Sequence, residues 1–275
     1  MALQIPAKLT ESELWPTSRD IVHFVGICGA GKSTMCADLA TRIEGHGGKV
    51  IGTIDYDPHT PDREAAAKRA FSRELDQRNI AAGCLDPAVH EAIVKHTLAT
   101  LTRWVESDAT VVLVDRWYES YDLLPPEHVS YIEAAIRSSG FRVHHVLLVV
   151  ANSIFGNDLE TIRARLLHTK GTRPASWWDS GPGSLDAWVR EEQACQDAYR
   201  VFVHRSPFGS LEINTAGMDW PEYEDQIVSS LIQRRWFDAF DGSWNDQSRT
   251  PGHAPSPNGR LWNTGRWMTA PKGVE

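Results

Sequence analysis

The segment that most constrains the fold is an apolar run that ends at a glycine and continues into a glycine-rich turn. Residues 21–34 read IVHFVGICGAGKST. They match the pattern G-x-x-x-x-G-K-[ST] at Gly26, Gly31, Lys32 and Ser33. The apolar run predicts a buried strand, and the residues after the turn follow a helical period. A strand, a glycine-rich turn and a helix start in this order are typical of a phosphate-binding loop.

The residue types in this loop suit the phosphates of ATP and a Mg²⁺ ion. Glycines let successive backbone N–H groups turn toward a phosphate without Cβ clashes, and the following helix start adds positive charge. Lys32 is predicted to bridge the β- and γ-phosphates, and the Ser33 hydroxyl to complete a Mg²⁺ shell. The predicted ATP-binding loop residues are Gly26, Cys28, Gly29, Ala30, Gly31, Lys32, Ser33 and Thr34. The alternative is a glycine turn without a ligand.

Predicted strands and helices alternate along the chain. The strands are expected over 21–26, 49–55, 110–115, 142–150 and 209–216. The helices are expected over 34–44, 62–79, 87–106, 126–140, 158–171, 184–205 and 220–237, with a short one after the Thr10–Glu13 capping box. Continuously apolar strands indicate a sheet that is covered on both faces. The expected fold is therefore α/β, with three layers and a mainly parallel five-stranded sheet.

The chain length and composition fit one globular enzyme domain with a tail. The chain has 275 residues, 41% of them hydrophobic, and one domain is expected over 1–240. Residues 241–275 are rich in Gly, Pro, Ser and Asn and predict an irregular tail. Its tryptophans could dock on the domain or on a partner; they are Trp244, Trp262 and Trp267.

The charge and the apolar runs limit the classes of partner. The formal net charge of −8 argues against general nucleic-acid binding, because an acidic surface repels phosphates. The longest apolar run, 146–151, is too short to span a bilayer, so no membrane partner is expected. The N-terminus lacks a basic-then-apolar signal pattern, so the expected location is cytoplasmic.

A carboxylate ends the third predicted strand. Asp115 follows the apolar run TVVLV, and a carboxylate beside a phosphate loop supports Mg²⁺ through water. The alternative is a turn or helix-capping aspartate. Arg116 follows at once and would lie near the reacting phosphates, unless it is a surface ion-pair residue.

Three segments together resemble the thymidylate kinase family and its nucleoside-kinase relatives. They are GICGAGKST, VVLVDRWYES and EINTAG…EDQIVSSL, within roughly residues 21–233. Trp117 stands where the family has tyrosine. The resemblance implies a P-loop kinase fold with strand order 2-3-1-4-5 and a helical lid, and ATP with Mg²⁺ as donor. It also implies an acceptor bound between the second strand, the 62–106 helices and the lid; a homodimer is left open.

The acceptor side departs from the family pattern. Tyr56-Asp57-Pro58 stands where the family has Arg-Glu-Pro, and that arginine helps to hold an acceptor phosphate. Its replacement favours a neutral hydroxyl as acceptor. Asp55 or Asp57 is then the predicted general base, although both also suit a turn.

The family's arginine-bearing lid is expected over about 158–185. Arginines that close on the γ-phosphate would neutralise charge and exclude water. Arg163 and Arg173 are the predicted catalytic arginines, with Arg165 and Lys170 nearby. The alternative is a polar surface loop.

The loop after the fifth strand is similar to the family's adenine-side loop. Thr215 and Gly217 are predicted to present backbone groups to the base edge. A turn followed by a helix cap, without a ligand, is the alternative.

The expected function is ATP- and Mg²⁺-dependent transfer of the γ-phosphoryl group to a hydroxyl or monophosphate of a nucleoside-like small molecule. One alternative is a kinase with another acceptor: an antibiotic, a sugar, another metabolite or a modified base in DNA. A nucleotide-binding module is a further alternative, although N-K-x-D and DxxG guanine signatures are absent from the sequence.

Overall fold

The protein is built on a parallel sheet with helices on both faces. The computed structural model describes residues 9–52, 87–115, 117, 124–151, 158–170 and 184–241. The strands are β1 (Asp20–Gly26), β2 (Val50–Gly52), β3 (Val111–Asp115), β4 (Arg142–Val149) and β5 (Gly209–Asn214). They lie in the order β2-β3-β1-β4-β5, and every pairing between them is parallel. The expected fold class and strand order are therefore confirmed.

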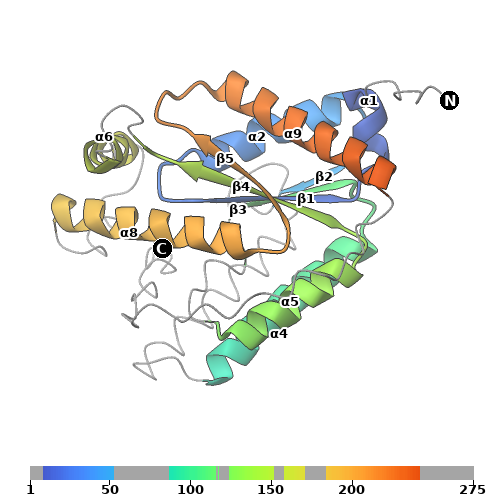
Figure 1. Ribbon diagram of the computed structural model, residues 1–275, viewed down its shortest axis with the longest axis horizontal. Coiled ribbons are helices and arrows are strands. Elements are labelled where there is room, and N and C mark those ends of the chain that lie inside the picture. Colours follow the sequence, from blue (N-terminus) through green and yellow to red (C-terminus); the bar gives the residue numbers. More distant parts are fainter. Residues whose placement is uncertain are drawn as a thin grey trace, which may run out of the picture.

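The helices form the two outer layers (Figure 1). One face of the sheet carries α2 (Lys32–Gly45) and α9 (Trp220–Asp241), with α1 (Glu11–Leu14) and the 3₁₀ turn Trp15–Thr17 beside them. The other face carries α4 (Pro87–Glu106), α5 (Pro126–Ser138) and α8 (Leu185–Arg205). The remaining helix, α6 (Asp158–Lys170), lies beyond the sheet and packs against α8.

The central strand β1 is buried along its whole length, and its side chains alternate between two cores. Val22 and Phe24 belong to the core shared with α2 and α9. Ile21 belongs to the core shared with α4 and α5. Because both faces are covered, the apolar run needs no polar alternation, as the sequence indicated.

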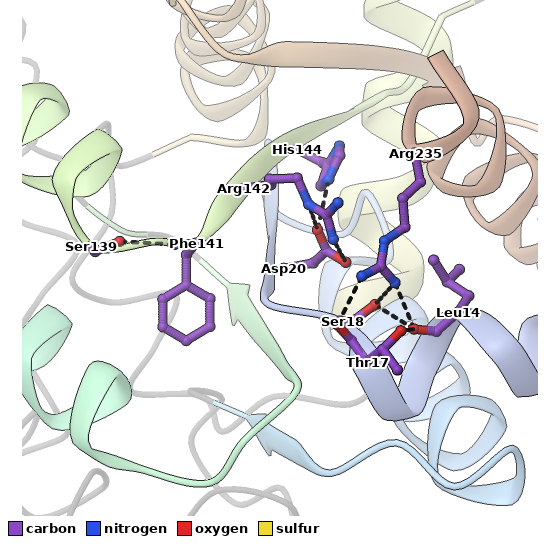
Figure 2. A network of polar contacts seen from close by, with 9 residues as sticks. All are labelled: Leu14, Thr17, Ser18, Asp20, Ser139, Phe141, Arg142, His144 and Arg235. Atoms are coloured by element: carbon purple, nitrogen blue, oxygen red, sulfur yellow. Dashed lines mark hydrogen bonds and ion pairs between the residues drawn. The ribbon is translucent and has the colours of Figure 1, made fainter. Parts of the chain in front are cut away.

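A group of polar contacts lies at the edge of the sheet where the strands begin (Figure 2). Asp20, with a side chain only 3% exposed, accepts a 2.8 Å hydrogen bond from Arg142 Nε and a 3.2 Å one from His144 Nε2. Burial alone would raise the pKa of Asp20, but the hydrogen bond and charge of His144 and the charge of Arg142 lower it to about 2. We call Asp20, Arg142 and His144 the amino-edge cluster.

A second contact set at this edge joins the last helix to the first turn. Arg235 of α9 donates to the carbonyl oxygens of Leu14 and Thr17, both at 2.7 Å, and to Ser18 Oγ at 3.1 Å. The short N-terminal helix is thereby fixed to the domain. Its predicted cap is present, because Thr10 N donates to Glu13 Oε2 at 2.9 Å.

Element boundaries differ from the expectations by a few residues. The helix after the glycine turn begins at Lys32 rather than at residue 34, because Gly31 is its N-cap. The predicted helix 62–79, the end of the second strand and the tail from residue 242 lie outside the described residues. None of the described helices combines the length and apolarity that crossing a bilayer requires.

Candidate functional site

The glycine-rich turn connects β1 to α2 through backbone that side chains rarely adopt. Gly26, Gly29 and Gly31 have φ values of 152°, 76° and 95°. A Cβ on Gly26 would overlap the carbonyl oxygen of Leu148, and one on Gly31 would overlap the ring of Trp220. Glycine is therefore required at both positions by conformation and by space.

Lys32 is held at the start of the turn. Its Nζ donates to the carbonyl oxygens of Gly26 and Ile27, each at 2.9 Å, and the residue is only 6% exposed. The same ammonium lies 4.0 Å from Asp115 Oδ1. The lysine charge is thus held beside the turn rather than extended into solvent.

Ser33 and Asp115 meet although they are far apart in sequence. The β1–β3 register pairs Phe24 with Asp115, which places the end of β3 beside the turn. Ser33 Oγ donates to Asp115 Oδ2 at 3.0 Å. A hydroxyl and a carboxylate side by side are oxygen donors of the kind that Mg²⁺ prefers. The chemistry of these two side chains fits the predicted Mg²⁺ ion, and their role as its ligands stays a prediction.

Glu192 of α8 is a residue that sequence analysis did not single out. It is 4% exposed, and its Oε2 accepts a 3.0 Å hydrogen bond from Cys28 N, inside the turn. One helical turn later, Gln196 accepts from Val150 N at 2.7 Å and donates to Val150 O at 3.3 Å. The available sequence signal was a stripe of Trp188, Glu192 and Gln196 at four-residue spacing, which places polar groups on a buried helix face.

Arg163, a predicted lid arginine on α6, contacts α8. Its Nη2 lies 2.6 Å from Asp186 Oδ1 on α8, and its Nε lies 3.8 Å from Glu160 Oε1. Arg163 thus pairs α6 with α8 in this structure, and its predicted role at the γ-phosphate stays a prediction.

Arg165, two residues further along α6, is buried instead. It is 6% exposed, donates to the carbonyl oxygen of Thr215, and its guanidinium carbon lies 5.7 Å from the Trp220 ring centre. Burial lowers the pKa of Arg165 from its usual value, against an opposing influence of Tyr223. Because the Trp220 ring also packs on Gly31, this ring connects α6 to the glycine-rich turn.

The predicted base-side residues lie in the loop that follows β5. Thr215 is fully buried, and its N–H donates to Val149 O at 2.8 Å. Its carbonyl accepts from Arg165, so both backbone groups of Thr215 already have protein partners. Gly217 lies next to Tyr223, because a Cβ there would approach the Tyr223 hydroxyl to 3.2 Å. The base contacts of Thr215 and Gly217 stay predictions.

Part of the predicted site lies outside the described residues. This holds for the proposed bases Asp55 and Asp57, for Arg116 and for Arg173. Trp117, next to Arg116, is described and belongs to the core. It is 7% exposed, and the centre of its ring lies 5.1 Å from the centre of the Trp104 ring.

No protein-family model and no curated protein sequence matches the chain. Solved structures with a similar backbone include the YorR protein of Bacillus subtilis in complex with phosphorylated GDP, at 13% identity and a TM-score of 0.45 over 78% of this chain and 97% of that one. A gluconokinase from Sinorhizobium meliloti 1021 has 14% identity and a TM-score of 0.44, over 82% and 98%. Shikimate kinase from Acinetobacter baumannii in complex with shikimate has 15% identity and a TM-score of 0.40, over 78% and 96%. With TM-scores below 0.5, these similarities transfer neither substrate nor activity.

Proposed function

We propose that the protein is a P-loop kinase that transfers the γ-phosphoryl group of ATP, with Mg²⁺, to a nucleoside-like small molecule. One observation carries this proposal. The glycine turn, Lys32, Ser33 and Asp115 come together at the carboxyl ends of β1 and β3. Ligands of open α/β sheets bind at this edge.

Each residue of this group has a distinct task in phosphoryl transfer. In this proposal the turn's backbone N–H groups, apart from that of Cys28, which donates to Glu192, and the start of α2 hold the phosphates, and Lys32 offsets charge on the β- and γ-oxygens. Ser33 directly and Asp115 through water would hold Mg²⁺, and the ion would supply positive charge near the transferred phosphoryl group. Catalysis in such a site is mainly positioning and charge neutralisation, and in this proposal Lys32, Mg²⁺ and the lid arginines supply them.

The acceptor is proposed to be a hydroxyl or a monophosphate of a nucleoside-like molecule, with the hydroxyl favoured. The support is the Tyr56-Asp57-Pro58 sequence, which lacks the arginine that the family uses for an acceptor phosphate. In this proposal Asp55 or Asp57 accepts the hydroxyl proton.

Binding is the first test of the proposed function. Calorimetric titration of the full chain with ATP and with GTP, each with and without Mg²⁺, is expected to show ATP uptake that strengthens with Mg²⁺. The variant Asp115→Asn should lose most of the Mg²⁺ enhancement while it keeps Mg²⁺-free binding. Uptake of neither nucleotide would contradict the proposal.

The acceptor is then identified by transfer of label from γ-labelled ATP. The panel holds nucleosides, nucleoside monophosphates, sugars and an oligonucleotide with a hydroxymethylated base. Label on a nucleoside supports the proposed acceptor. Label on a sugar or on the oligonucleotide would instead identify that molecule as the acceptor. Tight MgATP binding with no labelled product across the panel favours the nucleotide-binding module instead.

A further inference from the structure

The buried carboxylate of Glu192 is a feature that the proposed function does not use. It comes from α8, more than 150 positions after the phosphate loop, and contacts that loop directly at Cys28 N. A carboxylate inside a protein is stable only when donors compensate for its lost hydration. One of its donors is a backbone N–H within the loop that is proposed to hold the nucleotide's phosphates.

The face of α8 that carries Glu192 is fixed on both sides of this contact. Trp188, four residues earlier, is 2% exposed and belongs to the core with α2. Gln196, four residues later, makes two hydrogen bonds with the backbone of Val150, just after β4. A carboxylate on so firmly held a helix is a rigid support, unlike one on a mobile surface side chain.

The first turn of α8 contacts α6, which belongs to the expected lid. Asp186, in the first turn of α8, lies 2.6 Å from Arg163 of α6. The rigid helix therefore connects two parts of the proposed site, the phosphate loop through Glu192 and the lid helix through Asp186.

We propose that Glu192 is a positioning residue for phosphoryl transfer, whose carboxylate oxygen braces the phosphate loop at Cys28 and couples it to the α6–α8 pair. It acts through the loop backbone and does not touch the transferred group. This inference rests on the proposed function, because it assigns to Glu192 the preorganisation of the loop that binds MgATP.

A series of substitutions at Glu192 tests whether the residue acts through the reach of its hydrogen-bonding oxygen or through its charge. Glu192→Gln keeps an oxygen at the same reach and removes the charge. Glu192→Asp keeps the charge but is one methylene too short, and Glu192→Ala removes both. Asp197→Asn is the matched control, because Asp197 lies on the same helix with its side chain 61% exposed.

The first readout is amide hydrogen exchange of the loop in the nucleotide-free full chain. Peptides covering residues 20–34 should exchange faster in the Asp and Ala variants than in the wild type, while peptides of β4 keep their protection. The Gln variant and the control should resemble the wild type. Equal exchange in all variants would overturn the proposal.

The second readout is MgATP affinity by calorimetry together with the kcat and KM of ATP hydrolysis. Glu192→Gln should stay within about fivefold of the wild type, because a neutral acceptor replaces a charged one. The Asp and Ala variants should lose on the order of 10- to 100-fold in kcat/KM, because a displaced loop misplaces the phosphates. A Gln variant as impaired as the Ala variant would show that charge, not bracing, matters, and would also overturn the proposal.

The two readouts distinguish a failure of this inference from a failure of the proposed function. If the wild type binds no MgATP, the kinase proposal fails, and the exchange data still decide whether Glu192 braces the loop. If the Ala variant does not fold, the comparison of Gln with Asp decides, because these two differ from the wild type by one atom or one methylene.

Discussion

At the amino edge of the sheet Asp20 accepts hydrogen bonds from Arg142 and His144, whereas at the carboxyl edge Asp115 accepts one from Ser33 and lies 4.0 Å from Lys32. Asp20 is the first residue of β1 and Asp115 is the last residue of β3, and each lies beside a basic side chain. The amino-edge cluster is made of side chains alone. The carboxyl edge adds a turn of left-handed glycines and the start of α2.

The difference shows that a buried ion pair does not by itself mark a functional site. Perturbed pKa values occur in structural networks too, and we expect Asp20, with a pKa of about 2, to belong to such a network. What distinguishes the carboxyl edge is a turn whose glycines have φ values that other residues rarely adopt, followed directly by the start of α2. The amino edge should therefore contribute stability, and the carboxyl edge should contribute catalysis.

The largest expected effect is the loss of catalysis on removing the carboxyl-edge cation. Lys32→Ala should lower phosphoryl transfer by about 10³-fold, because it removes the charge that offsets the γ-phosphate. The free energy of unfolding should fall by about 2 kcal/mol, since two hydrogen bonds to carbonyl oxygens and the ion pair with Asp115 are lost. Transfer of label from γ-labelled ATP and urea unfolding measure the two quantities.

The control for Lys32→Ala is Lys49→Ala. The Lys49 side chain is 63% exposed and pairs with Asp108, so this change should leave transfer unaltered. Full activity of the Lys32 variant would end the distinction between the edges.

A second test compares a left-handed glycine from each edge. Gly31 has a φ of 95° and packs against Trp220. Gly140, which follows α5, has a φ of 80°, and among the described residues other than its chain neighbours a Cβ there would meet no atom within 4 Å. Gly140→Ala should cost about 1–2 kcal/mol of stability through backbone strain alone. Gly31→Ala should cost more because of the overlap, and should weaken MgATP binding at least about tenfold by displacing the loop.

Urea unfolding and MgATP calorimetry on both variants measure this difference. Equal costs and unchanged binding in the two variants would mean that Trp220 does not constrain the loop.

The third test removes a charged side chain at the amino edge, where we expect a loss of stability rather than a loss of catalysis. Because the pKa of Asp20 is lowered from its ordinary 3.8 to about 2, its contribution is complete above pH 3.8 and is lost as the pH falls through 2. This shift corresponds to about 2 kcal/mol. Asp20→Asn should cost about 2–5 kcal/mol at pH 7 and flatten the loss of stability between pH 4 and 2.

Urea unfolding from pH 2 to 7 measures the effect, with MgATP affinity at pH 7 as the control quantity. A large loss of affinity in folded Asp20→Asn protein would contradict the division between the edges.

The smallest expected effect concerns the Trp220 ring between Gly31 and Arg165. Trp220→Phe should weaken MgATP binding about threefold, because a smaller ring packs less well on the loop. Nucleotide binding is expected to change the tryptophan fluorescence, and Trp220→Phe should remove most of this change. Trp104→Phe, a core change in the opposite layer, should keep that fluorescence change.

The sequence predicted the sheet and the loop well because both depend on local signals. Apolar runs located all five strands, and the spacing of Gly26, Gly31, Lys32 and Ser33 located the turn. Asp115 was predicted as the metal-side carboxylate because it ends an apolar run, and the structure brings it to Ser33. Its metal role, like the other site assignments, stays a prediction.

Glu192 and Arg165 could not be predicted in the same way. Each lies in a helix among other charged residues, such as Glu191 and Arg163, and local sequence does not say which one of a pair is buried. Helix rotation against the sheet decides that, and rotation depends on packing against distant strands.

The sequence by itself determined the order of strands and helices and the conformation of the phosphate loop, because hydrophobic period and glycine stereochemistry act within a few residues. Only the tertiary structure decided that Ser33 meets Asp115, that Glu192 meets Cys28, and that Arg165 and Gly31 share the Trp220 ring. These contacts join residues on different elements, and they form because a parallel sheet gathers the carboxyl ends of its strands at one edge.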